Sequence, residues 1–60
     1  MTGLEILQKE LRENIDARRD ALAQGRVADY AEYRQIVGVL TGLTSALNRV
    51  NDLLDFEENN

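Results

Sequence analysis

Two groups of carboxylates recur at helical spacing in this chain. Paired carboxylates can bind Mg²⁺ or Ca²⁺, or act as general acid and base. Their members are Glu10, Glu13, Asp16 and Asp20 in the first half, and Asp52, Asp55 and Glu58 near the end. Neither group has the calcium-loop pattern, and no Glu-x-x-His motif for a di-iron bundle occurs. We therefore interpret both groups as solvated helix faces and expect no metal site and no cofactor.

The composition lacks the side chains on which most catalytic sites depend. Histidine, the commonest general base and metal ligand, is absent, and so are cysteine and proline. No nucleophile–base pair can be assembled from the remaining residues, so we expect a protein that is not an enzyme and has no catalytic residues. The absence of cysteine excludes a disulfide framework and fits a reducing compartment such as the cytoplasm.

Arginines gather around the middle of the chain, where they could contact phosphate or an acidic partner surface. We name this group the tip basic patch, because it surrounds the turn predicted at about residues 25–29. It consists of Arg18, Arg19, Arg26 and Arg34. From residue 18 to 34, four arginines against three acids give +1, and elsewhere three bases against eight acids give −5. The alternative is a solvated turn whose acids neutralise the arginines. The net charge of −4 argues against a nucleic-acid partner, and the polarity favours an antiparallel dimer.

Apolar spacing identifies the elements that carry these residues. From Tyr33 to Leu54, apolar residues alternate at intervals of three and four, which is a heptad seam of three repeats. A narrower stripe precedes Gly25, with Arg18 at one expected apolar position. The predicted helix–helix seam consists of Leu4, Leu7, Leu11, Ile15, Leu22, Tyr33, Ile36, Leu40, Leu43, Leu47, Val50 and Leu54. The spacing predicts helices over about 3–24 and 30–56.

Capping signals mark the ends of both helices. Thr2 and Glu5 form a capping-box pattern, Gly25 is a C′ residue that tolerates the left-handed conformation, and Asp29 with Glu32 starts the second helix. A turn over about 25–29 makes two long amphipathic helices antiparallel neighbours. The sequence therefore predicts an all-α fold: one helical-hairpin domain over residues 1–60.

The second predicted helix has a wider apolar surface than one partner helix requires, so we expect a second contact surface. Glycine and alanine recur every four residues on it, and such a ridge lets another backbone approach closely. The candidate partner surface consists of Gly38, Val39, Gly42, Ala46 and Leu53. The alternative is that the two glycines are merely tolerated. Tyr30 and Tyr33 are interpreted as a cap on the hairpin core near the turn.

The length of the chain predicts association. A core built from 60 residues rarely stabilises a domain by more than about 3–5 kcal/mol without disulfides, metals or oligomerisation. We therefore expect oligomerisation to complete the hairpin into a four-helix bundle or a larger assembly. The expected partners are further copies of the chain, a larger protein assembly, or both. No apolar run approaches the roughly 20 residues that span a bilayer, so no membrane partner is expected, and no small-molecule substrate is expected.

Three segments carry a resemblance to a known group of proteins: DYAEYR at 29–34, GVLTGL at 38–43 and GLEILQKEL at 3–11. With these segments the chain resembles small proteins of unassigned function from tailed bacteriophages. It departs from the pattern of that family at Val37, where the family often carries cysteine. The resemblance implies a phage accessory protein, such as a minor virion or head–tail component. It implies a location in the host cytoplasm and in the virion, and it supplies no active site.

Together these observations favour a structural or assembly module that acts through helix–helix contacts. The main alternative is a small regulator that binds and inhibits a host or phage protein through the same surfaces. A further alternative is an RNA- or DNA-binding regulator of the small dimeric helical kind.

Overall fold

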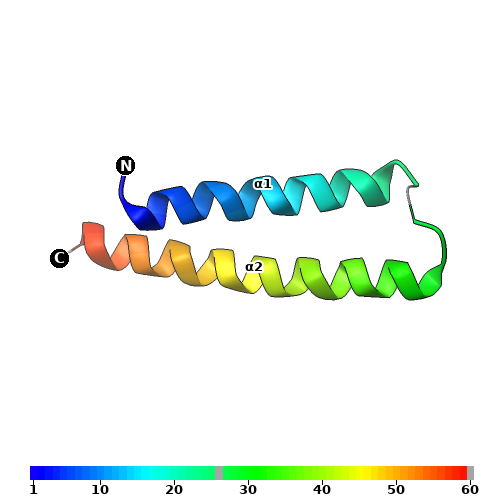
Figure 1. The fold of residues 1–60 in the computed structure, drawn as a ribbon. Helices are drawn as coiled ribbons and strands as arrows, with labels where there is room; N and C mark the ends of the chain where they lie inside the picture. Colours follow the sequence, from blue (N-terminus) through cyan, green and yellow to red (C-terminus); the bar gives the residue numbers. More distant parts are fainter. Residues whose placement is uncertain (26, 60) are drawn as a thin grey trace.

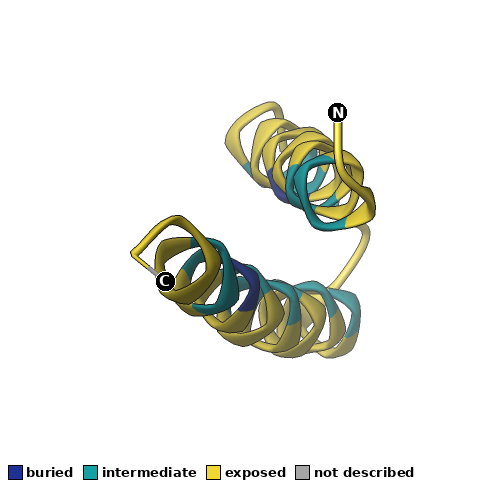
Figure 2. Ribbon diagram, turned by 90° about the vertical axis from the view of Figure 1, so that its left-hand side faces the viewer, coloured by how far each residue is buried: buried dark blue, intermediate teal, exposed yellow. Residues whose placement is uncertain are grey.

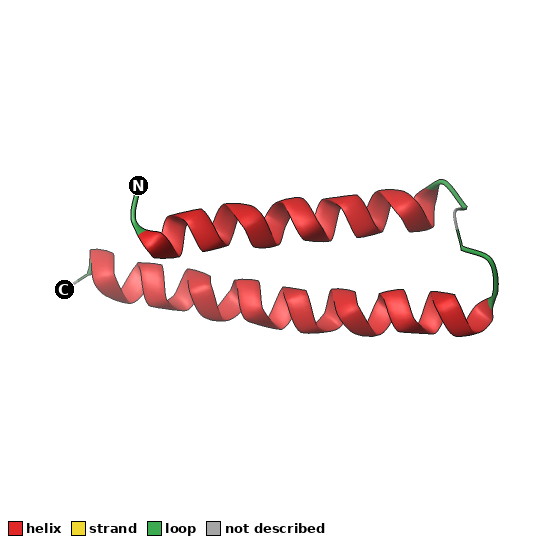
Figure 3. Cartoon of the chain, viewed as in Figure 1, coloured by secondary structure: helices red, strands yellow, loops and turns green. Residues whose placement is uncertain are grey.

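The chain forms two α-helices that lie side by side and run in opposite directions (Figure 1). The computed structural model describes residues 1–25 and 27–59, in which α1 spans Gly3–Ala23 and α2 spans Tyr30–Glu58. These described residues contain no strand (Figure 3). The predicted all-α helical hairpin is confirmed, and its completion into a bundle stays a prediction.

Both ends of α1 lie beside residues that commonly cap helices. The Thr2 hydroxyl accepts a hydrogen bond from the Glu5 amide at 3.2 Å, and the Glu5 carboxylate accepts one from the Thr2 amide at 3.3 Å. This is the predicted capping box. At the other end, Gly25 has a φ of 68° and donates its amide to the Leu22 carbonyl at 3.1 Å. That bond is part of a Schellman-type helix end, in which glycine occupies the left-handed position.

α2 begins at Asp29 and continues beyond the residue at which we predicted its end. The Asp29 carboxylate accepts from the Glu32 amide at 2.8 Å, while Glu32 reaches back to the Ala28 amide at 3.0 Å. The helix ends at Glu58 instead of about Phe56. Asn59 explains the extension, because its backbone and side-chain amides both donate to the Asp55 carbonyl, at 3.1 and 2.9 Å.

The core is a single layer of side chains between the two helices. Buried and half-buried residues line the surfaces where the helices face each other, and the outer surfaces are exposed (Figure 2). In the described part only Ile15 and Val50 count as buried, at 4% and 5% exposure. Two helices cannot surround a side chain, so the seam stays open along both flanks. The molecule is rod-shaped, 47 × 17 × 14 Å, with a radius of gyration of 14.0 Å against about 10 Å for a compact 60-residue domain.

A polar pair joins the two helices near their open end. The Gln8 side-chain amide donates to the Asn51 side-chain oxygen at 2.6 Å, and both residues are half-buried. Because the partners lie 43 residues apart, this bond ties one point on α1 to one point on α2. A polar pair within an apolar seam favours one register over its neighbours.

Candidate protein-interaction surfaces

The predicted seam supplies the contact between the helices, with two exceptions. Ten of its twelve residues are buried or half-buried, as is Arg18, the polar residue in the apolar stripe. Leu7 and Tyr33 are exposed, at 41% and 46%. The exposure has a geometric cause: both residues lie at the edge of the stripe, where a single neighbouring helix does not reach. Both residues belong to the predicted seam by their spacing, but the two helices by themselves do not bury them.

The candidate partner surface lies away from the helix–helix contact. Gly38, Val39, Gly42 and Ala46 are exposed, and Leu53 is half-buried at the edge of the seam. A Cβ atom placed on Gly38 or Gly42 would meet nothing within 4 Å. The hairpin itself therefore gives no reason for either glycine, and the ridge that they form stays open to a second helix.

The described members of the tip basic patch differ in their exposure and surroundings. Arg18 is half-buried and donates to the Asn14 side chain at 3.3 Å, whereas Arg19 and Arg34 are exposed on different helices. Arg26 lies outside the described residues. The two tyrosines near the tip also differ from expectation. Their rings stack on each other, 6.2 Å apart at 18°, and both remain exposed instead of capping the core.

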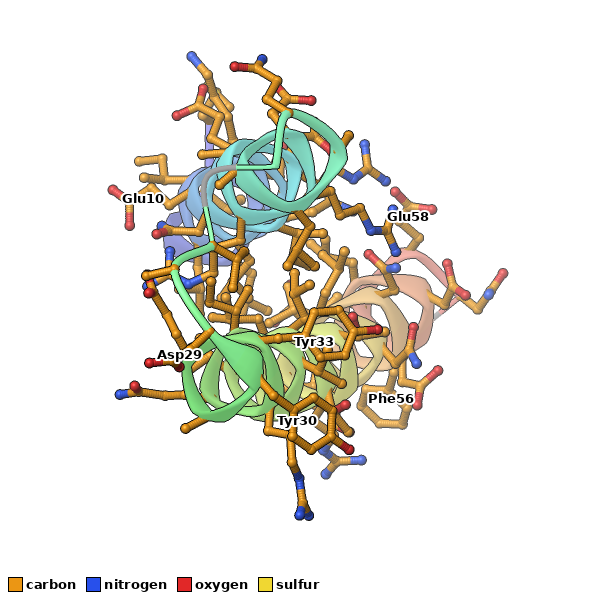
Figure 4. All side chains as sticks on the ribbon, turned by 90° about the vertical axis from the view of Figure 1, so that its right-hand side faces the viewer. Glu10, Asp29, Tyr30, Tyr33, Phe56 and Glu58 are labelled. Atoms are coloured by element: carbon orange, nitrogen blue, oxygen red, sulfur yellow. The ribbon has the colours of Figure 1, made fainter. Side chains whose placement is uncertain are left out.

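A polar groove that we did not predict runs along one flank of the hairpin. It consists of two adjoining hollows, of about 410 and 280 Å³, which share Arg12. Viewed along the helices, Glu58 projects on the flank of the groove and Glu10 on the opposite flank (Figure 4). The residues that line the groove are Glu5, Gln8, Arg12, Ile15, Asp16 and Arg19 from α1, and Thr44, Leu47, Asn51, Leu54, Asp55 and Glu58 from α2.

The heptad pattern contains a signal that could have revealed this groove. On α1, Gln8, Arg12 and Asp16 each follow a seam residue by one position. A step of one residue turns about 100° around a helix, so these side chains flank the seam on one side. On α2, Thr44 and Asn51 follow Leu43 and Val50 in the same way. These positions are polar, so the periodicity of either helix alone places them on the solvated face.

The carboxylate groups stay dispersed. Among the described residues no group of three or more acidic side chains could hold a metal ion. Lys9 and Glu13 form an exposed ion pair at 4.0 Å, so one member of the first group serves the surface of α1. The two described helices also include no stretch long and apolar enough to cross a membrane.

Comparisons with protein families, with characterised proteins and with solved structures find no match for this chain. The resemblance to phage proteins therefore stays a hypothesis.

Proposed function

We propose that this chain is a non-enzymatic assembly module that acts through helix–helix contacts with other protein surfaces. The observation that carries the proposal is the large exposed apolar surface. Across residues 1–25 and 27–59, these large apolar side chains are exposed: Met1, Ile6, Leu7, Tyr30, Tyr33, Val37, Val39 and Phe56. The chain exposes 4571 Å² in all, against about 4,000 Å² for a compact monomer of 6.8 kDa.

The energetics of a lone hairpin support association. Burial stabilises a fold in proportion to the apolar area removed from water, at roughly 25 cal/mol per Å². Among residues 1–25 and 27–59 only two side chains are buried, and both belong to the seam. A second protein surface laid against either flank would cover half-buried residues such as Leu47 and Leu53, so that association and folding stabilise each other.

The candidate partner surface suits a close contact. Around Gly42, the neighbours Val39 and Ala46 present short side chains, and the glycine has open space above it. Small residues at a four-residue interval allow another helix backbone to approach. A phage particle is the assembly that the resemblance implies. The alternative proposal, an inhibitor of a host or phage enzyme, would use this same surface.

Sedimentation and thermal unfolding by circular dichroism test the proposal together. We expect oligomers at micromolar concentration and a Tm that rises with protein concentration, because only the associated state is well buried. A monomer that unfolds cooperatively at micromolar concentration, with a Tm independent of concentration, would contradict the proposal. An asymmetric complex with an isolated enzyme, in place of a symmetric assembly, would favour the inhibitor instead.

A further inference from the structure

We infer that the polar groove is the docking site for a second copy of this chain, arranged antiparallel about a two-fold axis. The inference rests on the proposed function and names the partner for one of its surfaces. It leaves the candidate partner surface, which includes Val39 and Ala46, free for a different protein.

The groove contains charged side chains that form no ion pair within residues 1–25 and 27–59. Lys9 and Glu13 form the one ion pair among the described residues. Arg12 and Arg19 on α1, and Asp55 on α2, are exposed and make no ion pair in that part of the molecule. Charges at an interface steer association and set the orientation of the partners.

The charge of the groove changes along its length. The hollow near the open end adds three acids, Glu5, Asp55 and Glu58, to the shared Arg12. The hollow toward the tip adds one base, Arg19, and one acid, Asp16. An antiparallel second copy, turned about an axis near the middle of the rod, places its less acidic tip end against the acidic open end of the first. A surface of this kind is complementary to itself, as a two-fold interface requires.

The position of Arg12 and Asp16 locates the axis. An axis through Arg12 would bring two guanidinium groups together. An axis that crosses α1 midway between the two residues instead pairs each Arg12 with Asp16 of the other copy. Arg19 then lies about four residues, or roughly 6 Å of helix, from the level of the other copy's Glu5, within reach of an extended arginine side chain.

The floor and the size of the groove fit a dimer interface. Leu47 and Leu54 provide half-buried apolar area, and the Gln8–Asn51 hydrogen bond satisfies both amides. No buried polar side-chain atom in the described residues lacks a partner. The broad face of the hairpin, 47 by 17 Å, has an area of about 800 Å², which is what each partner contributes to a stable interface.

A mixing experiment with charge reversals tests the inference. The full-length variants are Arg12→Glu and Asp16→Arg, with Arg49→Glu as control, because Arg49 is exposed on α2 outside the groove. Each groove variant opposes like charges in its own dimer, so we expect association at low salt to weaken at least about tenfold. In a mixed dimer of the two groove variants, opposite charges face each other again in both pairs of positions 12 and 16. We therefore expect the affinity of the equimolar mixture to return to within about threefold of that of the original chain. Arg49→Glu should associate normally.

The outcomes separate this inference from the proposed function. If the original chain forms oligomers but neither reversal weakens them, or if the mixture does not recover, the inference is overturned and the assembly module stands. A matched pair of valines tests the same inference without a change of charge. Val37 lies one heptad before Thr44 of the groove and Val39 one heptad before Ala46, at 38% and 39% exposure. Stronger weakening by Val37→Gln supports the groove, and stronger weakening by Val39→Gln overturns it. A folded monomer overturns both proposals.

Discussion

Gly25 makes the hairpin possible at the scale of a single residue. Its φ of 68° lies in the left-handed region, where a side chain with a Cβ atom is strained. The Gly25 amide donates to the Leu22 carbonyl and so closes the end of α1. Gly38 differs, since it sits inside α2 with open space where a Cβ would lie. The two glycines therefore serve different ends, and substitution by alanine should affect them in opposite directions.

Gly25→Ala should lower the free energy of unfolding by about 1–2 kcal/mol, because alanine is strained in the left-handed region. Gly38→Ala should raise it by up to about 1 kcal/mol, because alanine favours the helix and meets no neighbour. Urea unfolding at one fixed protein concentration measures both. A loss at Gly38 equal to that at Gly25 would contradict this account and would indicate that something already packs on the glycine ridge.

At the scale of the elements, the relation between α1 and α2 rests on a narrow seam with one polar bond in it. Ile15 and Val50 are packed in the seam, and Gln8 and Asn51 meet at the edge of it. Leucines at heptad spacing allow several registers of nearly equal energy, whereas a hydrogen bond between two half-buried amides forms in only one of them. The polar pair therefore selects the register at some cost in apolar contact.

A double-mutant cycle of Gln8→Ala and Asn51→Ala should give a coupling free energy of about 0.5–1.5 kcal/mol, the usual net value of one hydrogen bond. Each single substitution leaves the other amide half-buried without its partner. Asn48→Ala is the control, because Asn48 is exposed on α2. Denaturant unfolding of the four proteins measures the coupling. Additive effects would mean that the pair does not hold the register.

At the scale of the whole molecule, charge and shape act together. The rod is 47 Å long, and its acids concentrate toward the open end while arginines extend toward the tip. In the dimer that we propose, two such rods associate in opposite directions. The charges concerned are exposed along the groove, so that salt screens them readily.

Self-association should therefore weaken as NaCl is raised from low concentration toward 1 M, where the screening length falls to about 3 Å. Sedimentation equilibrium across a salt series measures the effect. If the chain associated only through the apolar candidate partner surface, its affinity would not fall as NaCl is raised, because salt does not weaken apolar burial. An affinity that is constant or rises with salt would assign the interface to that surface.

Local patterns in the chain decided the helices and their ends. Three patterns are concerned: the heptad spacing from Tyr33 to Leu54, the capping box at Thr2 and the left-handed glycine at 25. Each depends on residues only a few positions apart, so its effect can be predicted from the sequence without a structure. The end of α2 was the exception. The spacing predicted an end at about residue 56, but the helix continues to Glu58, and Asn59 caps it by bonds to the Asp55 carbonyl.

The tertiary structure decided which residues the two helices share and which they leave exposed. Leu7 and Tyr33 belong to the heptad pattern yet are exposed, while Gln8, Thr44 and Asn51 do not belong to it and are half-buried. The groove has the same origin, because its lining comes from residues more than 20 positions apart. Burial depends on how the helices are rotated and offset against each other, and periodicity along one helix contains neither quantity.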